Sequence, residues 1–335
     1  MVDFPTRKTV YEQIEKARDS KILTYVTGDR RGMESQIGPD VVDIFVDHLD
    51  ALWPAKRISL ILYTSGGNTA AAWRLINLLR TFCDELEVLV HSKAHSAGTL
   101  MCLGADRIIL TKQATLGPID PSLNSPLSPQ IPGGMPNQRA PVSVEAVQGY
   151  LDVVQQELSI KDPTSLTTVW THLSEKIHPL VLGQIFRTRT QIRTLARKLL
   201  VNQKLDDKKT QAIIDFLCSN SGSHDHTINR REARDLGLVV ENPSEAFYAQ
   251  LREIHKSIVH TLKLGVAFSP DTELAGQNAV QYTNIRALVE SVAGGSDQFI
   301  SEGTITRLNI QQPNQPPQIG SMDNRTFEGW RKITP

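Results

Sequence analysis

The sequence lacks an excess of charge, a cysteine framework and any long hydrophobic run. Lysine plus arginine number 36, as do aspartate plus glutamate, so the basic surface that bulk nucleic-acid binding needs is missing. Cys83, Cys102 and Cys218 offer neither paired spacing nor metal-ligand spacing. A chain with so few cysteines is typical of a reducing compartment. We therefore expect a protein that does not bind nucleic acid and is not secreted.

Targeting and cofactor signals are also missing. The charged N-terminal stretch has no apolar core of the kind found in signal peptides, and no apolar run reaches the roughly 18 residues of a membrane span. We expect a cytoplasmic protein, which could lie peripherally at a membrane only through a partner. The dinucleotide and phosphate-loop fingerprints are absent, and there is no repeat of solenoid length. The sequence predicts no cofactor and no metal.

Strands alternate with helices over residues 20–112, a pattern that indicates an α/β fold with a mainly parallel sheet. Apolar runs predict the strands, and apolar residues at helical spacing predict the helices. The expected strands are 20–28, 57–64, 86–92 and 106–111, and the expected helices are 7–19, 39–52, 69–82 and 97–105.

The remainder of the chain is expected to be helical and then irregular. Residues 116–141 are crowded with Pro, Gly, Ser and Asn and predict a loop, and its part 122–141 could act as a lid or a substrate-binding segment. Periodicity is lost from about residue 265, and 308–326 is expected to be extended or disordered. Between them, helices are expected at 143–158, 164–203, 206–220 and 228–237.

These patterns suggest three parts of unequal size. An N-terminal helix would occupy residues 1–19, and the main domain would span 20–245 with a loop and helical insertion at about 122–165. A partly irregular C-terminal extension would cover 246–335.

The first turn of chemical interest lies in "ILYTSGGNTAAAWRLINLLR", residues 61–80, where an apolar strand meets a helix at Gly66 and Gly67. Glycines allow positive φ and a close approach of the backbone to a ligand. The free N–H groups at the start of the following helix, with the positive end of its dipole behind them, suit an oxyanion. The alternative is a tight turn between packed elements.

The second turn lies in "VLVHSKAHSAGTLMCLGADRIIL", residues 88–110, where Ser96 opens a helix after a buried strand. Its small neighbours Ala97 and Gly98 leave the hydroxyl accessible, although a plain N-cap is the alternative. Because the carboxyl ends of parallel strands share one edge of a sheet, we expect both turns to meet there.

Together the two turns and the motif at 116–121 carry a family resemblance. Residues 57–122 resemble the Clp/crotonase fold of serine peptidases, above all the serine dehydrogenase proteinase family, which is related to signal peptide peptidase A. The Leu-Gly-Pro-Ile-Asp-Pro motif at 116–121 fits the family pattern closely, and 225–241 is similar to its last helix and strand. The resemblance implies an α/β fold of repeated ββα units with a mainly parallel sheet and additional helices.

The resemblance also implies roles for individual residues. Ser96 takes the nucleophile position, and the amides of Gly66, Gly67 and Ala97 take the positions of the oxyanion hole. The histidine of Clp protease would fall at about Ile119–Asp120 in this sequence, and neither position holds a histidine.

A different general base is therefore needed. Signal peptide peptidase A uses a lysine on a later helix, for which Lys176 is the match and His178 the alternative, so a Ser-Lys dyad is one expectation. Either choice requires 122–165 to be an insertion. His224 and Asp225 could support the site or lie in a solvated loop. With His226 they could also suggest metal ligands, but no further cluster elsewhere in the sequence completes such a site.

The sequence thus predicts a serine endopeptidase that cleaves a protein or peptide substrate and uses no ATP of its own. The alternatives are an acyl-CoA-binding crotonase-like enzyme, which needs no nucleophilic serine, and a catalytically inactive scaffold. The resemblance further implies a homo-oligomer, as a ring or as stacked trimers.

Overall fold

The computed structural model describes residues 3–119, 122–123, 125–133, 135, 137–220, 226–310 and 318–333. The chain divides into two compact units. The first unit combines Met1–Leu116 with Asn229–Pro335, and the second is Gly117–Ile228. Each unit is described by itself.

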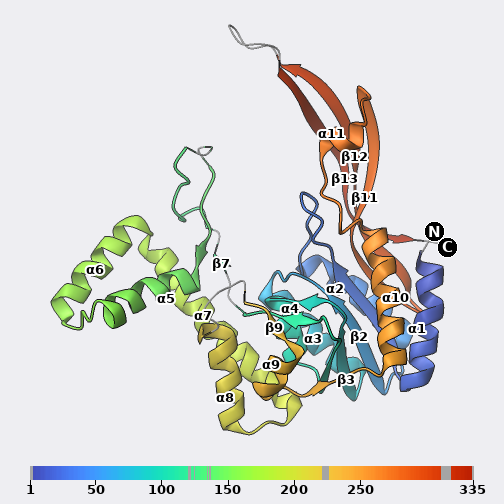
Figure 1. The fold of residues 1–335 in the computed structure, drawn as a ribbon, viewed down its shortest axis with the longest axis horizontal. Helices are drawn as coiled ribbons and strands as arrows, with labels where there is room; N and C mark the ends of the chain where they lie inside the picture. The colour runs from blue at the N-terminus through green and yellow to red at the C-terminus, as the bar shows by residue number, and fades with distance from the viewer. Residues whose placement is uncertain are drawn as a thin grey trace. The chain divides into compact units, whose positions relative to one another are not determined.

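Within the described residues of the first unit, eight strands form the main sheet in the order β10-β5-β3-β2-β1-β11-β12-β13 (Figure 1). The first five strands in this order are parallel to one another. Their central rows are apolar because parallel strands are covered on both faces, as in the row Leu23, Leu60, Val88 and Ile108. The five strands are β1 (Lys21–Thr27), β2 (Arg57–Tyr63), β3 (Glu85–Val90), β5 (Arg107–Leu110) and β10 (Val240–Glu241). The mixed α/β architecture with a mainly parallel sheet is as predicted.

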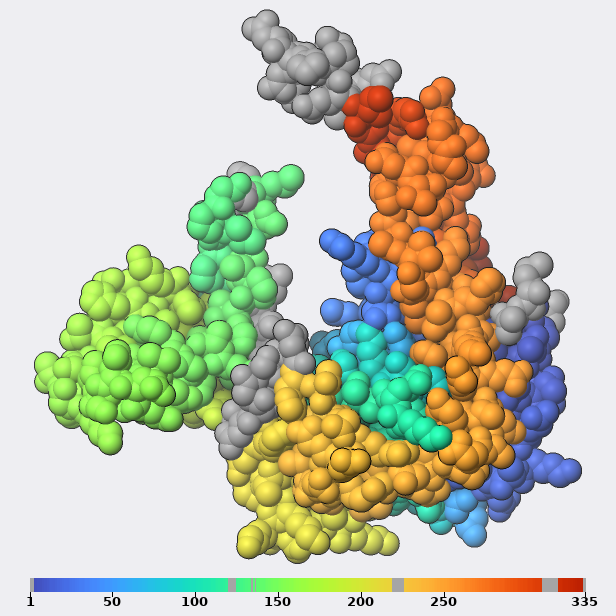
Figure 2. All heavy atoms as spheres, in the orientation of Figure 1, coloured from blue at the N-terminus to red at the C-terminus, as the bar shows by residue number. Residues whose placement is uncertain are grey.

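The C-terminal segment extends this sheet with antiparallel strands. β11 (Ala279–Ser291) pairs with β1, and β12 (Gly295–Ile310) and β13 (Gln318–Ile333) follow in turn. They form the orange-to-red ribbon that reaches beyond the other strands of this unit, and Figure 2 shows its side chains on the surface. The expectation of an irregular segment from about residue 265 is wrong for these strands. β11 pairs with the distant β1, and β12 and β13 each pair with the strand before them, so strand pairing rather than a local sequence pattern determines their structure.

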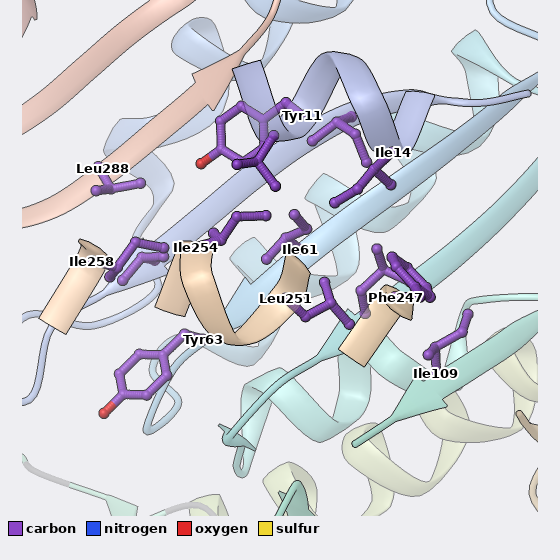
Figure 3. Close-up of a cluster of buried hydrophobic side chains, with 14 of the residues drawn as sticks. Tyr11, Ile14, Ile61, Tyr63, Ile109, Phe247, Leu251, Ile254, Ile258 and Leu288 are labelled. Atoms are coloured by element: carbon purple, nitrogen blue, oxygen red, sulfur yellow. The ribbon is translucent and has the colours of Figure 1, made fainter. Parts of the chain in front are cut away.

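Two helices cover one face of the parallel strands. α1 (Phe4–Arg18) and α10 (Glu245–Thr261) pack on the sheet through a buried apolar cluster (Figure 3). The cluster includes Tyr11, Ile61 and Leu251.

α2 (Val42–Leu52) covers the opposite face, since successive side chains of a strand alternate. In β1 the side chains of Ile22 and Val26 join the α1/α10 cluster, whereas Tyr25 meets Phe45 of α2 edge to face, with ring centroids 5.2 Å apart.

A buried ion pair ties α1 to the sheet. Glu290 of β11 accepts hydrogen bonds from Arg7 Nε at 2.8 Å and Arg7 Nη2 at 2.5 Å, and from the Tyr11 hydroxyl at 2.8 Å. Arg7 is 1% exposed and Glu290 is 0% exposed. A buried charge pair of this kind is tolerated because the hydrogen bonds replace the lost hydration of both groups.

Shorter elements complete the first unit. α3 follows β2, and Asn68 caps it by accepting a hydrogen bond from the Ala71 N–H at 2.8 Å. β4 and β6 pair in parallel beside the main sheet. The bounds are α3 (Thr69–Phe82), β4 (Lys93–Ala94), α4 (Ala97–Leu103), β6 (Thr115–Leu116), α9 (Arg230–Asp235) and α11 (Pro270–Leu274), with a 3-10 turn at Pro39–Val41. β9 (Ile228–Asn229) precedes α9.

The second unit is mainly helical, as the sequence predicts for this region. An apolar cluster that includes Val147 of α5 and Ile185 of α7 holds it together. Asp162 and Asp206 cap α6 and α8 through their side chains. The elements are β7 (Ser122–Leu123), β8 (Val142–Ser143), α5 (Val144–Asp152), α6 (Pro163–Lys176), α7 (Pro179–Leu200) and α8 (Asp207–Asp215). Short π-helical segments, Val153–Glu157 and Phe216–Asn220, continue α5 and α8, and a 3-10 turn, Val201–Gln203, ends α7.

Candidate active site

The turns after β2 and β4 touch each other at Gly66 and Ser96. An ideal Cβ on Gly66 would lie 2.9 Å from Ser96 Cβ, 3.4 Å from Ser96 Oγ and 3.1 Å from the carbonyl oxygen of His95. Gly66 also has a φ of +118°, which L-residues rarely adopt. Glycine is therefore required here both for the backbone conformation and for the space that Ser96 occupies.

Ser96 has an unusual backbone conformation for a residue with a side chain. Its φ is 51° and its ψ is −114°, and such an outlier costs about 1–3 kcal/mol. The strain turns the chain sharply from β4 into α4. Ser96 occupies the N-cap position of α4, but its side chain makes no capping hydrogen bond. The plain N-cap interpretation is thus not what the geometry shows.

The hydroxyl of Ser96 is available for chemistry. Ser96 is partly exposed, and within the described part of the chain its Oγ has no hydrogen-bond partner. An accessible hydroxyl is one requirement of a serine nucleophile, and a general base that accepts its proton is the other.

Two backbone amides next to Ser96 are also unused. Among the described residues, neither the Gly67 N–H nor the Ala97 N–H donates a hydrogen bond. Ala97 is the first residue of α4, so its amide belongs to the set that a helix cannot satisfy internally. The Gly66 N–H, in contrast, donates to Thr64 Oγ1 at 2.9 Å. The free donors near Ser96 are therefore Gly67 and Ala97.

The direction of the Gly67 amide follows from one hydrogen bond. The carbonyl oxygen of Gly66 accepts from the Ile37 N–H at 2.9 Å. Because a trans peptide unit directs its C=O and N–H to opposite sides, the Gly67 N–H points away from Ile37. Asn68 N–H donates to the Ile37 carbonyl at 2.8 Å and fixes the other side of the turn.

Titratable groups near the turns have other partners. His95 Nε2 lies 2.9 Å from Thr115 Oγ1. Lys93 forms an ion pair with Asp29, which also accepts a hydrogen bond from the Tyr63 hydroxyl at 2.8 Å. Burial alone would raise the pKa of Asp29, but the Lys93 ammonium and the Tyr63 hydroxyl hold that pKa below its ordinary value. The Lys93 side chain is therefore already engaged in an ion pair with Asp29.

The candidate bases lie in the second unit. Lys176 is the last residue of α6 and is exposed. His178 is exposed and caps α7, since its Nδ1 accepts from the Leu180 N–H at 3.2 Å. His224 and Asp225, as well as Asp120, lie outside the described residues.

A serine–histidine–aspartate cluster that the sequence analysis does not identify occurs elsewhere in the first unit. His48 Nδ1 lies 2.7 Å from Ser291 Oγ, and His48 Nε2 lies 3.0 Å from Asp297 Oδ2. His48 and Ser291 are 0% exposed, so no substrate reaches this serine. The cluster joins α2 to the hairpin of β11 and β12 and has a structural role. No metal-binding group of three or more His, Cys, Asp or Glu occurs among the described residues.

Comparison with known proteins finds a family match over the part of the chain that contains the two turns. Residues 40–140 match the family of ClpP-like SDH-type serine proteinases. The resemblance to the ClpP-like SDH-type family is thereby confirmed, and this segment contains both turns and Ser96.

Two curated relatives of the chain come from Methanocaldococcus jannaschii. The uncharacterized protein MJ0137 is 30% identical over 205 residues, which are 61% of this chain and 60% of the relative. The uncharacterized protein MJ1495 is 24% identical over 198 residues, which are 59% of this chain and 56% of the relative. The match thus spans at most 60% of the length of these relatives.

Two solved structures of the 1510-N membrane-bound stomatin-specific protease are also similar. A serine-to-alanine mutant has a TM-score of 0.39 and 15% identity, covering 70% of this chain and 84% of that chain. A lysine-to-alanine mutant in complex with a substrate peptide has a TM-score of 0.39 and 14% identity, covering 68% and 78%. Over the described residues of the present chain, no helix combines the length and apolar character needed to cross a membrane.

Proposed function

We propose that the protein is a serine endopeptidase in which Ser96 is the nucleophile. The observation that carries the proposal is the contact of the two turns, which sets a strained, accessible serine beside two unused amides. Ser96 Oγ attacks the scissile carbonyl carbon, and the Gly67 and Ala97 N–H groups bind the oxyanion. Removing one preorganised donor of this kind typically lowers kcat by a factor of about 10²–10³.

Gly66 has a different role in this proposal from that of Gly67. Its amide is already bound to Thr64, so it serves the site through its positive φ and its missing Cβ. These leave room for Ser96 and for the substrate carbonyl.

The proton of Ser96 passes to Lys176 or His178 in the proposed mechanism, and then to the leaving amine. Collapse of the first tetrahedral adduct breaks the C–N bond and leaves an ester on Ser96, which water hydrolyses. A lysine loses its proton near neutral pH only when it is desolvated. We therefore expect Lys176 to act only when substrate or a neighbouring subunit covers it. His224 and Asp225 remain proposed supports.

The proposal extends to partners and location. We propose a protein or peptide substrate and a homo-oligomer, as a ring or as stacked trimers, since the family resemblance implies both. We propose a cytoplasmic location, with membrane association only through a partner. No cofactor is part of the mechanism.

Covalent labelling tests the nucleophile. A fluorophosphonate probe is expected to label the wild type and not Ser96→Ala. Ser65→Ala is the matched control, because Ser65 is an exposed serine in the neighbouring turn, and it should label like the wild type. Labelling that persists in Ser96→Ala would refute the assignment of Ser96 as the nucleophile, whereas a wild type that does not label would favour the acyl-CoA-binding or scaffold alternatives.

Paired substitutions test the base. Lys176→Arg keeps the positive charge but removes an amine that can lose its proton. His178→Asn keeps a side chain that can cap α7 but removes the imidazole. Hydrolysis of a peptide ester should fall at least about 100-fold in one of the two variants. Unchanged hydrolysis in both would exclude both residues and direct attention to His224.

A further inference from the structure

A buried threonine lies directly beneath the turn that carries the proposed oxyanion donor. Thr64 follows β2 and is 0% exposed. Its Oγ1 accepts the Gly66 N–H at 2.9 Å, lies 3.3 Å from the Gly66 carbonyl oxygen and lies 2.6 Å from Thr27 Oγ1. One arrangement of protons satisfies all three contacts: Thr27 donates to Thr64, and Thr64 donates to the Gly66 carbonyl. The Thr64 hydroxyl then accepts from the N–H of Gly66 and donates to the C=O of Gly66, so it holds both polar groups of that residue.

Holding Gly66 in this way orients Gly67. The Gly66 carbonyl and the Gly67 N–H belong to one rigid peptide unit. Thr64 and the Ile37 N–H both bind that carbonyl, so the unit cannot rotate without losing both interactions. The orientation of the Gly67 amide, the proposed oxyanion donor, is therefore fixed through the carbonyl of the same peptide unit.

The same residue also holds the turn of the nucleophile. The Thr64 N–H donates to the Lys93 carbonyl at 3.2 Å, and the His95 N–H donates to the Thr64 carbonyl at 3.1 Å. The Thr64 methyl group fills the space beside Gly98, where a Cβ would overlap it. Gly98 lies in the first turn of α4, two residues after Ser96.

We propose that Thr64 is a positioning residue that sets the distance between Ser96 and the Gly67 amide, with Thr27 supporting its hydroxyl. The inference rests on the proposed peptidase function and adds a residue to it. The Thr64 hydroxyl binds the Gly66 turn and its C=O binds the Ser96 turn, while its N–H and methyl group contact β4 and α4, the elements on either side of the Ser96 turn. Substrate does not contact this residue, because it is fully buried.

The test compares three threonine variants in the full chain. Thr64→Val keeps the shape but removes the hydroxyl, whereas Thr64→Ser keeps the hydroxyl and removes the methyl. Thr111→Val is the control, since Thr111 is a buried threonine after β5 whose hydroxyl donates to the His91 carbonyl at 2.5 Å. It should lose stability without a specific effect on the turns.

The measurements separate positioning from folding. Thr64→Val should lower kcat for a peptide ester about 10- to 100-fold with KM changed less than about threefold, because a misplaced donor weakens only transition-state binding. The Gly66 amide, followed by NMR with ¹⁵N-glycine, should exchange at least about 10-fold faster with solvent. Thr64→Ser should restore both values, and Thr111→Val should leave both near wild type.

The possible results distinguish a failure of the Thr64 positioning role from a failure of the proposed peptidase function. If Thr64→Val keeps the wild-type kcat, or if the Gly66 exchange rate does not change, the positioning role is overturned while the peptidase function stands. If the wild type shows no Ser96-dependent labelling, the proposed function fails, and the inferred role of Thr64 fails with it.

Discussion

Replacing Gly66 by alanine is expected to separate the two turns of the candidate site. The new Cβ would lie 2.9 Å from Ser96 Cβ, which is closer than Cβ contacts in folded proteins, and 3.1 Å from the His95 carbonyl oxygen, which is tighter than most. Both neighbours belong to the Ser96 turn, so the strain falls directly on the proposed nucleophile.

The size of the effect has two parts. Forcing an L-residue to the positive φ of Gly66, +118°, costs about 1–3 kcal/mol. Crowding a well-packed position adds about 1–3 kcal/mol. Gly276→Ala separates these contributions, because Gly276 has a φ of +87° and, among the described residues, no heavy atom within 4 Å of the added Cβ. In this control variant, only the cost of placing an L-residue at positive φ applies, because nothing among the described residues crowds the added Cβ.

Urea unfolding and fluorophosphonate labelling measure the two consequences. Gly66→Ala should lower the free energy of unfolding by about 1–3 kcal/mol more than Gly276→Ala does. It should also slow Ser96 labelling at least about 10-fold, whereas Gly276→Ala should label normally. Equal losses of stability together with normal labelling in Gly66→Ala would show that the turns do not press on each other.

Two further predictions concern the first unit. Glu290→Gln should lower the free energy of unfolding by about 3–5 kcal/mol, since it leaves the buried Arg7 charge uncompensated. The double variant Arg7→Met/Glu290→Leu should lose less unfolding free energy than Glu290→Gln, because no unpaired charge stays buried. A larger loss in the double variant would contradict this reasoning. Burial, with the nearby charges of His255 and Arg252, lowers the pKa of His91 to about 3. The unfolded chain then binds the proton first, so stability should fall as pH drops from about 6.5 towards 3, by at most ~1.4 kcal/mol per pH unit. His91→Phe should flatten the plot of unfolding free energy against pH, and an unchanged slope would refute the assignment.

The parallel part of the fold could be predicted because its signals are local. Strands expected at 57–64 and 86–92 are β2 (Arg57–Tyr63) and β3 (Glu85–Val90). Strands covered on both faces are nearly continuous apolar runs, which stand out between charged helices. β11, β12 and β13 mix polar and apolar residues along exposed faces, so nothing local distinguishes them from a loop.

The candidate site shows the same division. Gly66 and Ser96 could be located because positive φ, small neighbours and the shared sheet edge are readable from sequence. The hydrogen bond from the Gly66 N–H to Thr64 could not be predicted from the sequence, since it depends on the dihedral angles of the turn. The base could not be assigned either, because Lys176 and His178 are separated from Ser96 by a long helical segment whose spacing carries no geometric rule.

The pairing of β1 with β11 has a consequence for synthesis on the ribosome. Thr27 aligns with Ala287 and Leu23 with Ser291, so during translation the central strand β1 lacks one of its neighbours until β11 has emerged. During that interval the nascent chain carries an uncovered strand edge and an Arg7 without its carboxylate. Chaperone capture during translation, and aggregation of products truncated before residue 287, are the expected consequences of pairing β1 with a strand so distant in the sequence.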